Sequence, residues 1–197
     1  IRLVSFTGGV AGGSAAAMAA SGQVKPIIME LGGKSPQIVL ADADLELAVN
    51  GIAAGIFPVS GQTCIAGSRL LVQREIHDEV VDRLRKVVSP ARLGHPKIAD
   101  TQIGPIANEP HFKRILEHID NAKSGGAKLI LGGTAVQPES APNGWFIEPT
   151  IFTGVTPDMP LAREEVFGPL LAVIPFGNEE DAIRLANDSK FGRSEER

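Results

Sequence analysis

The sequence has a single cysteine, no long apolar run and no cluster of basic residues, and each absence excludes a class of protein. One cysteine, Cys64, cannot form the disulfide framework of a small secreted domain. No apolar run reaches the roughly 18 residues that a membrane span needs, and no signal-peptide pattern opens the chain. No basic cluster with interleaved aromatic residues indicates a nucleic-acid surface. We therefore expect a soluble protein of a reducing compartment, the cytoplasm, with no nucleic-acid or membrane partner.

The composition is otherwise that of an ordinary globular protein. The 197 residues are 43% hydrophobic and 21% charged, with a net charge of −4, which allows one substantial core or two small ones. Both ends look cut. The chain begins at Ile1 without a methionine, directly before an apolar strand, and it closes on the charged segment Arg193–Arg197. We expect a piece of a larger polypeptide.

Predicted strands and helices alternate along the chain, which is typical of a parallel α/β sheet with crossover helices. Helices are indicated by apolar residues at helical spacing and by capping residues, such as Asp42 or Asp44 before the second helix. The expected strands are Leu3–Phe6, Ile27–Leu31, Gln37–Leu40, Arg69–Gln73, Lys128–Leu131, Trp145–Phe152 and Leu170–Pro175. The expected helices are Ser14–Ala20, one carrying Leu45 to Ile56, Ile76–Val88, Pro110–Lys123 and Glu179–Asn187.

Cys64 stands in a loop between a predicted helix and a predicted strand, in the sequence Ser60-Gly61-Gln62-Thr63-Cys64-Ile65-Ala66-Gly67-Ser68-Arg69. A lone thiol is inert, metal-bound or reactive, and a free cysteine is often only a small buried hydrophobe. A thiolate is a strong nucleophile toward carbonyl carbon, but it needs a lowered pKa or a nearby base. Arg69 is the one positive charge close in sequence, and backbone N–H groups beside the glycines offer an oxyanion site.

Glu30 is the second candidate, because it is a carboxylate inside the apolar run Ile27–Leu31. Burial there would raise its pKa toward the range of a general base. Two structural alternatives stay open: a salt bridge to Lys34 or Arg69, or a strand end that faces water.

Three further motifs carry weaker signals. The glycine-rich Gly8–Gly13 follows a strand and opens a helix, which suits an anion or simple tight packing. Gly32-Gly33-Lys34-Ser35 looks like the end of a phosphate-binding loop, but Ile28 stands where that motif requires glycine. Glu164–Pro169 places two carboxylates and an aromatic side chain before a Gly-Pro turn and a buried strand. The structural alternative is a solvated turn. The four histidines are expected at the surface, without metal-ligand spacing; they are His77, His95, His111 and His118.

Taken in order, these motifs resemble the aldehyde dehydrogenase superfamily. Met29–Pro36 matches the glutamate signature of that family and Gly61–Arg69 matches its cysteine signature. The glutamate of the first motif, Glu30, and the cysteine of the second, Cys64, lie 34 positions apart (64 − 30), the usual spacing in the family. Phe6–Gly9 resembles the phosphate turn of its cofactor domain, and Glu164–Pro169 resembles its Glu-Glu-(Ile/Val)-Phe-Gly-Pro motif.

The resemblance implies a three-layer α/β fold, with a parallel or mixed sheet covered by helices on both faces. Residues 1–25 would end the dinucleotide-binding domain, residues 26–192 would form the catalytic domain, and residues 193–197 do not fit the pattern. It also implies oxidation of a small-molecule aldehyde to a carboxylic acid with NAD or NADP, by a homo-oligomeric parent protein.

The resemblance further implies a role for each matching residue. Cys64 would attack the aldehyde to give a thiohemiacetal and then a thioester, and Glu30 would activate the water that releases the acid. Glu165 would hold the nicotinamide ribose and Phe167 would pack against the nicotinamide. Gly8, Gly9 and Gly13 would contribute to the cofactor's pyrophosphate site.

The chain departs from the family pattern in three places. Gly9 replaces a serine that is common in the phosphate turn, and Pro58-Val59-Ser60 replaces a segment that carries asparagine or histidine in many members. The family's chain is also more than twice as long, so we expect this piece to be inactive alone. A cysteine-dependent acyl-transferase or thioester hydrolase is the alternative enzyme.

Overall fold

The computed structural model describes residues 1–192, which divide into two compact units. The smaller comprises residues 1–33 with Phe191 and Gly192, and the larger comprises residues 34–190. This division follows Gly33 rather than Lys25, because the strand that follows Lys25 pairs within the smaller unit. The boundary at residue 25 concerns the domains of the family and stays a prediction.

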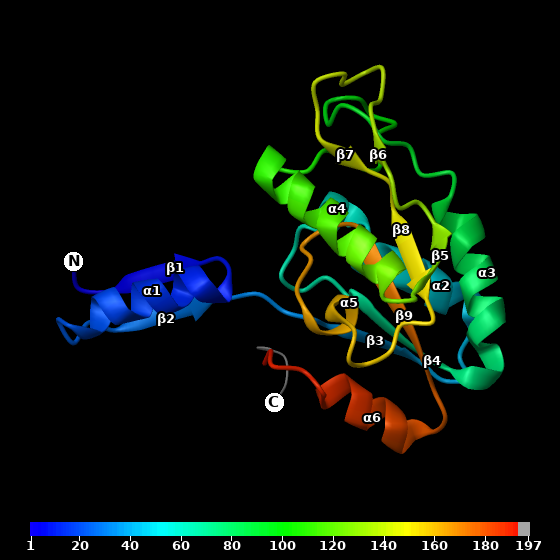
Figure 1. Ribbon diagram of the computed structural model, residues 1–197, viewed down its shortest axis with the longest axis horizontal. Helices are drawn as coiled ribbons and strands as arrows, with labels where there is room; N and C mark the ends of the chain where they lie inside the picture. Colours follow the sequence, from blue (N-terminus) through cyan, green and yellow to red (C-terminus); the bar gives the residue numbers. More distant parts are fainter. Residues whose placement is uncertain (193–197) are drawn as a thin grey trace. The chain divides into compact units, whose positions relative to one another are not determined.

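The smaller unit is a single βαβ motif. Strand β1 (Val4–Thr7) pairs in parallel with β2 (Ile27–Glu30), and helix α1 (Val10–Ser21) connects them (Figure 1). The helix begins before the predicted Ser14 and includes Gly12 and Gly13. A Cβ atom on Gly12 would lie 2.8 Å from the Phe6 ring, and one on Gly13 would lie 2.7 Å from Leu31. These glycines therefore allow the helix to pack closely on its two strands.

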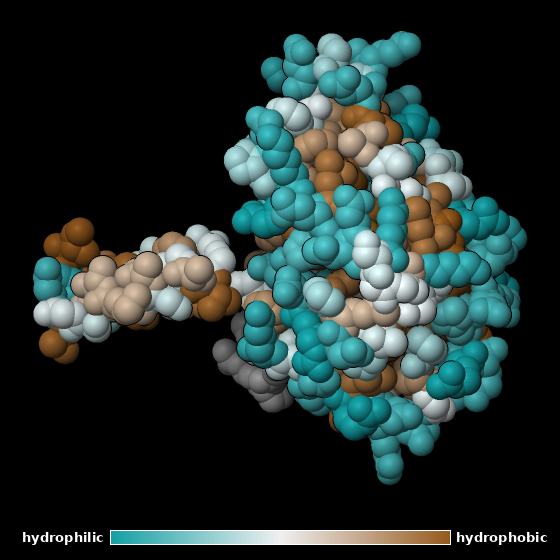
Figure 2. Space-filling model, in the orientation of Figure 1, coloured by the Kyte–Doolittle hydropathy of each residue, from teal (hydrophilic) through white to brown (hydrophobic). Residues whose placement is uncertain are grey.

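Apolar side chains are widely exposed on the smaller unit. In Figure 2 its visible face is mostly pale or hydrophobic in colour, whereas the larger unit is mostly hydrophilic. The exposed large apolar residues of residues 1–33 are Ile1, Leu3, Val10, Met18, Val24 and Ile28, of which Ile1 and Val24 are more than 90% exposed.

The larger unit contains a five-stranded mixed sheet in the order β3-β4-β9-β8-β5. Strands β3 (Pro36–Val39), β4 (Arg69–Gln73), β9 (Leu170–Phe176) and β8 (Thr150–Thr153) are parallel, and β5 (Lys128–Leu131) is antiparallel to β8. The small antiparallel pair β6 (Ala135–Val136) and β7 (Phe146–Ile147) is separate. The single predicted strand Trp145–Phe152 is thus wrong: the chain forms β7 and β8 in different sheets, with Pro149, which lacks an N–H donor, between them.

Helices cover both faces of this sheet, as expected (Figure 1). On one face, α4 (Glu109–Ser124), α5 (Pro160–Arg163) and α6 (Glu179–Asn187) pack against Leu71, Ala172 and neighbouring side chains. On the other face, α2 (Leu45–Ile56) and α3 (His77–Val88) pack against Leu70, Val173 and their neighbours. The alternating side chains of β4 and β9 supply both cores, which is the pattern of a strand buried on both faces.

Caps and short turns complete the elements. Asp44, one of the two predicted capping residues, accepts hydrogen bonds from the backbone N–H groups of Glu46 and Leu47 and so begins α2. One short 3₁₀ helix, Pro58–Gly61, lies between α2 and β4, and another, Arg74–Ile76, directly precedes α3. No helix of the described part of the chain is long and apolar enough to cross a membrane. The expected tail, Arg193–Arg197, lies outside the described residues.

Candidate active site

Three of the motifs lie at the same edge of the large sheet, where its parallel strands begin. The segment before β3 ends the glutamate motif, the segment before β4 carries Cys64, and the segment before β9 carries Glu165 and Phe167. Because these strands are parallel and adjacent, their amino ends lie side by side; Pro36 is in register with Arg69, and Arg69 with Ala172. The candidate site of the larger unit therefore lies at the amino edge of its sheet.

The cysteine loop, residues 58–68, is held by several hydrogen bonds. Ser60 Oγ donates to the carbonyl of Gly104 at 2.7 Å. The Gln62 side chain donates to the carbonyl of Pro105 at 3.2 Å and accepts from the N–H of Ala107 at 2.9 Å. Val59 and Ser60 have positive φ angles of 54° and 56°, an uncommon backbone conformation for such residues. Cys64 lies within this loop and is exposed.

The cysteine loop packs backbone to backbone on the segment that carries Glu165 and Phe167. A Cβ atom on Gly61 would lie 2.2 Å from the carbonyl oxygen of Gly168, closer than any real contact, and Gly61 has a φ of 68°. Only glycine permits both the conformation and the approach. The structure thus brings the cysteine loop to the segment 164–169. Glu165 is half-buried there, and Phe167 is 38% exposed.

Arg69 has a structural role in the larger unit. It is 3% exposed, and its guanidinium donates to the backbone carbonyls of Lys34, Leu185 and Ala186, each at 2.8 Å. Burial lowers the pKa of Arg69, and the carboxylate of Asp188 opposes this effect. The guanidinium therefore joins the start of β3 to the end of α6.

Lys34 is a site residue whose character the sequence did not reveal. It is 2% exposed, and its Nζ has no hydrogen-bond partner among the described residues. Burial lowers the pKa of Lys34 to about 7, and the charge of Arg69 acts in the same direction, while Glu165 and Glu164 oppose it. The sequence showed only a lysine that follows two glycines and stands two positions before a strand.

The other predicted residues lie in the smaller unit. Glu30 ends β2 and is exposed, which corresponds to a strand end that faces water, one of the alternatives that the sequence left open. The N–H of Gly8 donates to the carbonyl of Glu30 at 3.0 Å, which joins the glycine turn to the glutamate motif. Packing explains Gly8 and Gly13, whose Cβ atoms would clash with Phe6 and with Leu31.

Gly9 is the exception in this glycine-rich turn. A Cβ atom on Gly9 would have no neighbour within 4 Å, so packing within the chain does not account for the absence of a side chain. Gly9 is the N-cap of α1 and provides no side-chain cap for the first N–H groups of the helix. An open, uncapped helix start with no side chain in the way fits the close approach of a phosphate.

The histidines are only partly at the surface. His111 is 6% exposed, which contradicts the expectation for that residue, and His118 is half-buried. Burial lowers the pKa of both imidazoles. His111 was missed because its helix position faces the turn at Phe167, a contact that only the folded chain makes. Within residues 1–192, no group of histidine, cysteine and carboxylate side chains is placed to hold a metal ion.

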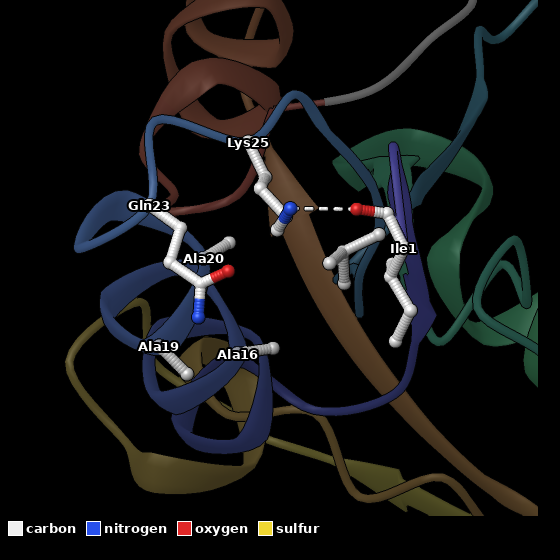
Figure 3. A pocket seen from close by; sticks show the side chains of 7 residues that line it. Ile1, Ala16, Ala19, Ala20, Gln23 and Lys25 are labelled. Carbon is white, nitrogen blue, oxygen red and sulfur yellow. Dashed lines mark hydrogen bonds between the residues drawn. The ribbon is translucent and has the colours of Figure 1, made fainter.

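A cavity of about 380 Å³ lies in the smaller unit, between α1 and the start of β1 (Figure 3). Lys25 crosses it and donates to the carbonyl of Ile1 at 2.6 Å. Its other lining residues are mostly apolar: Val4, Ala16, Ala19, Ala20 and Gln23. The cavity contains none of the predicted catalytic or cofactor residues.

Comparison with known proteins gives consistent matches. The model of the aldehyde dehydrogenase family matches residues 1–195. Betaine aldehyde dehydrogenase of Bacillus subtilis (strain 168) is 44% identical over 98% of this chain, which spans 39% of that protein. Peroxisomal aminoaldehyde dehydrogenase 1 of Pisum sativum is 45% identical over 96% of this chain, which spans 37% of it. The chain thus spans well under half the length of these relatives.

Solved structures agree with these relatives. An NAD-dependent aldehyde dehydrogenase from Sinorhizobium meliloti has a TM-score of 0.93 and 43% identity, with 98% of this chain and 38% of that chain covered. Betaine aldehyde dehydrogenase from Staphylococcus aureus, solved in complex with NAD⁺, has a TM-score of 0.94 and 42% identity over the same shares of the two chains.

Proposed function

Because this chain belongs to the aldehyde dehydrogenase family, we propose that the intact protein oxidises an aldehyde to a carboxylic acid with NAD⁺ or NADP⁺. One observation carries the proposal: an exposed cysteine thiol stands on a loop that packs against the segment of Glu165 and Phe167. The relatives solved with NAD⁺ favour NAD⁺ over NADP⁺.

Cys64 is the proposed nucleophile. Its thiolate attacks the aldehyde carbon, the carbon–oxygen double bond becomes an alkoxide, and a thiohemiacetal forms on sulfur. The backbone N–H of Cys64 is one donor for this oxyanion, in a loop whose conformation is already fixed before substrate binds. When bound, NAD(P)⁺ supplies the hydride acceptor that allows the thiohemiacetal to become a thioester.

Glu30 is the proposed base for the second half of the reaction. Its carboxylate takes a proton from water, the resulting hydroxide attacks the thioester carbon, and Cys64 leaves as a thiolate while the carboxylic acid is released. Exposure of Glu30 on the described chain is compatible with this role, because the residue must reach water.

Each unit offers residues that suit one part of a dinucleotide. Gly9, at the open start of α1, leaves room for the pyrophosphate, and Gly8 and Gly13 shape the same turn. The half-buried carboxylate of Glu165 suits a ribose hydroxyl, and the partly exposed ring of Phe167 suits the face of a nicotinamide.

We also propose a domain assignment for this chain. Residues 1–25 end a dinucleotide-binding domain, and residues 26–192 form the catalytic domain. The exposed apolar side chains of residues 1–33 support this, because such surfaces are usually covered by further protein. We also propose that the intact protein is a homo-oligomer. We propose the cytoplasm, a reducing compartment, as its location, because the nucleophile must stay a thiol.

The test is aldehyde-dependent formation of NADH by the intact protein. The panel contains betaine aldehyde, an aminoaldehyde and propanal, because the relatives act on the first two by name. Cys64→Ala is the inactive variant, and Ser68→Ala, in the same loop, is the matched control. Near-normal turnover by Cys64→Ala would exclude this nucleophile. Thioester hydrolysis without any NADH from any aldehyde would instead indicate the cysteine-dependent hydrolase or acyl-transferase.

A further inference from the structure

Phe167 has a backbone conformation that must be held by its surroundings. Its φ angle is 55°, in the left-handed region that bulky residues rarely adopt. The residue that follows, Gly168, is buried and makes the close approach to Gly61 described above. Whatever fixes Phe167 therefore also fixes the contact with the cysteine loop.

His111 makes two contacts with Phe167. It stands in the first turn of α4, where its N–H is held by the capping side chain of Asn108 at 2.9 Å. Its Nε2 lies 2.6 Å from the carbonyl oxygen of Phe167, and the two rings are 5.9 Å apart at an angle of 56°. The imidazole thus contacts both the strained backbone and the aromatic ring of the same residue.

Arg114 determines which nitrogen of His111 carries the proton. Its guanidinium lies 2.9 Å from Nδ1, and a guanidinium can only donate. Nδ1 must therefore be the acceptor, so the proton of the neutral imidazole is on Nε2. That N–H points at the carbonyl of Phe167, which can only accept. Burial lowers the pKa of His111 and the charge of Arg114 acts in the same direction, while the hydrogen bond to Phe167 opposes them.

The same face of α4 also contacts Gly168. A Cβ atom on Gly168 would lie 2.7 Å from Cδ1 of Ile115, one turn after His111. On its other side, the Gly168 carbonyl meets Gly61 of the cysteine loop. The buried peptide of Gly168 therefore lies between α4 and the loop of Cys64.

We propose that His111, with its tautomer set by Arg114, is a positioning residue for the reaction: its Nε2–H holds the Phe167–Gly168 backbone, and through it the Phe167 ring and the cysteine loop. This inference rests on the proposed function, since it concerns the cofactor face of Phe167. His111 itself is not a catalytic residue.

The test compares two amides at position 111 of the intact protein. A glutamine places its side-chain N–H about where Nε2 stands, whereas the shorter asparagine does not reach the carbonyl. Hydrogen exchange is followed in peptides covering residues 164–170 and 58–68, without cofactor. The rate of Cys64 alkylation by iodoacetamide is measured in parallel. KM for NAD⁺ and kcat are then measured with the best aldehyde of the panel.

We expect His111→Asn to accelerate exchange in both segments, to change the alkylation rate, and to raise KM for NAD⁺ by about tenfold or more. His111→Gln should restore all three, and exchange in α3 should stay the same in both variants. Unchanged exchange and KM in His111→Asn would overturn the proposal. So would a glutamine variant as impaired as the asparagine variant, because packing rather than the hydrogen bond would then be responsible.

A second variant covers the case in which His111→Asn does not fold. Arg114→Met removes an exposed guanidinium and leaves the imidazole in place. It should change exchange and KM in the same direction but less, and a value equal to that of the parent would overturn the tautomer argument. If the intact protein forms no NADH, only the proposed function is refuted. The positioning role of His111 is still decided by the rates of hydrogen exchange and of Cys64 alkylation, because both are measured without cofactor.

Discussion

The buried ammonium of Lys34 makes the stability of this protein depend on pH in a defined direction. Its pKa is lowered from the usual 10.5 to about 7, mainly by burial. Between these values the unfolded chain holds a proton on Lys34 that the folded chain does not. Stability therefore rises with pH across this window, and the full cost of the buried charge is present below pH 7.

The magnitude follows from the two pKa values. A tenfold change in proton affinity is worth about 1.4 kcal/mol, so the complete window corresponds to about 5 kcal/mol. About 3 kcal/mol of this change in the free energy of unfolding occurs between pH 6.5 and pH 9.5. Lys34→Met keeps the length of the side chain and removes the charge. We expect the free energy of unfolding of Lys34→Met to exceed that of the unsubstituted protein by about 3 kcal/mol more at pH 6.5 than at pH 9.5.

Urea unfolding at the two pH values measures this difference, followed by the fluorescence of the single tryptophan and by circular dichroism. Lys97→Met is the matched control, because Lys97 is exposed, and its difference from the parent should not change with pH. A constant difference between Lys34→Met and the parent at both pH values would refute the reasoning, since other titrating groups are common to both proteins.

Three other predictions concern the proposed chemistry, the glycine contact and the extent of the chain. In the intact protein, Glu30→Gln should slow deacylation and let a Cys64 thioester accumulate, detectable by mass spectrometry of acid-quenched enzyme; an unchanged rate without trapped thioester would count against Glu30 as the base. Gly61→Ala should lower the free energy of unfolding by at least about 2 kcal/mol, because of the contact with Gly168, whereas Gly51→Ala in open space on α2 should raise it by up to about 1 kcal/mol. Calorimetry should detect no NAD⁺ binding by this chain alone, which spans 39% of a relative; micromolar affinity would contradict this.

Local patterns predicted most of the fold. Apolar spacing identified α2, α3, α4 and α6, and short apolar runs identified the buried strands, because these elements depend mainly on which side chains face a core. Errors occurred where a tertiary contact overrides local preference. The predicted helix began at Ser14, but α1 includes Gly12 and Gly13, whose missing side chains leave room for Phe6 and Leu31.

The motifs predict Cys64 as the nucleophile of the site, and this assignment stays a prediction. The glycines around Cys64 indicate close backbone packing, and Gly61 does pack closely on Gly168. The burial of Lys34 and His111 was not predictable, because it results from elements distant in sequence. Lys34 is enclosed near Glu164 and Glu165, and His111 meets Phe167 across 56 positions of the chain.

The amino-edge entry of β3, β4 and β9 has a practical consequence for altering this protein. All three site segments of the larger unit precede their strands, so the turns at the opposite ends of the same strands carry none of them. The exposed segment between β3 and α2, residues 40–44, and the turn at Gly177 and Asn178 are such places. New chain termini, a fluorescent label or a short insertion placed there would leave the cysteine loop and the Phe167 segment unmodified.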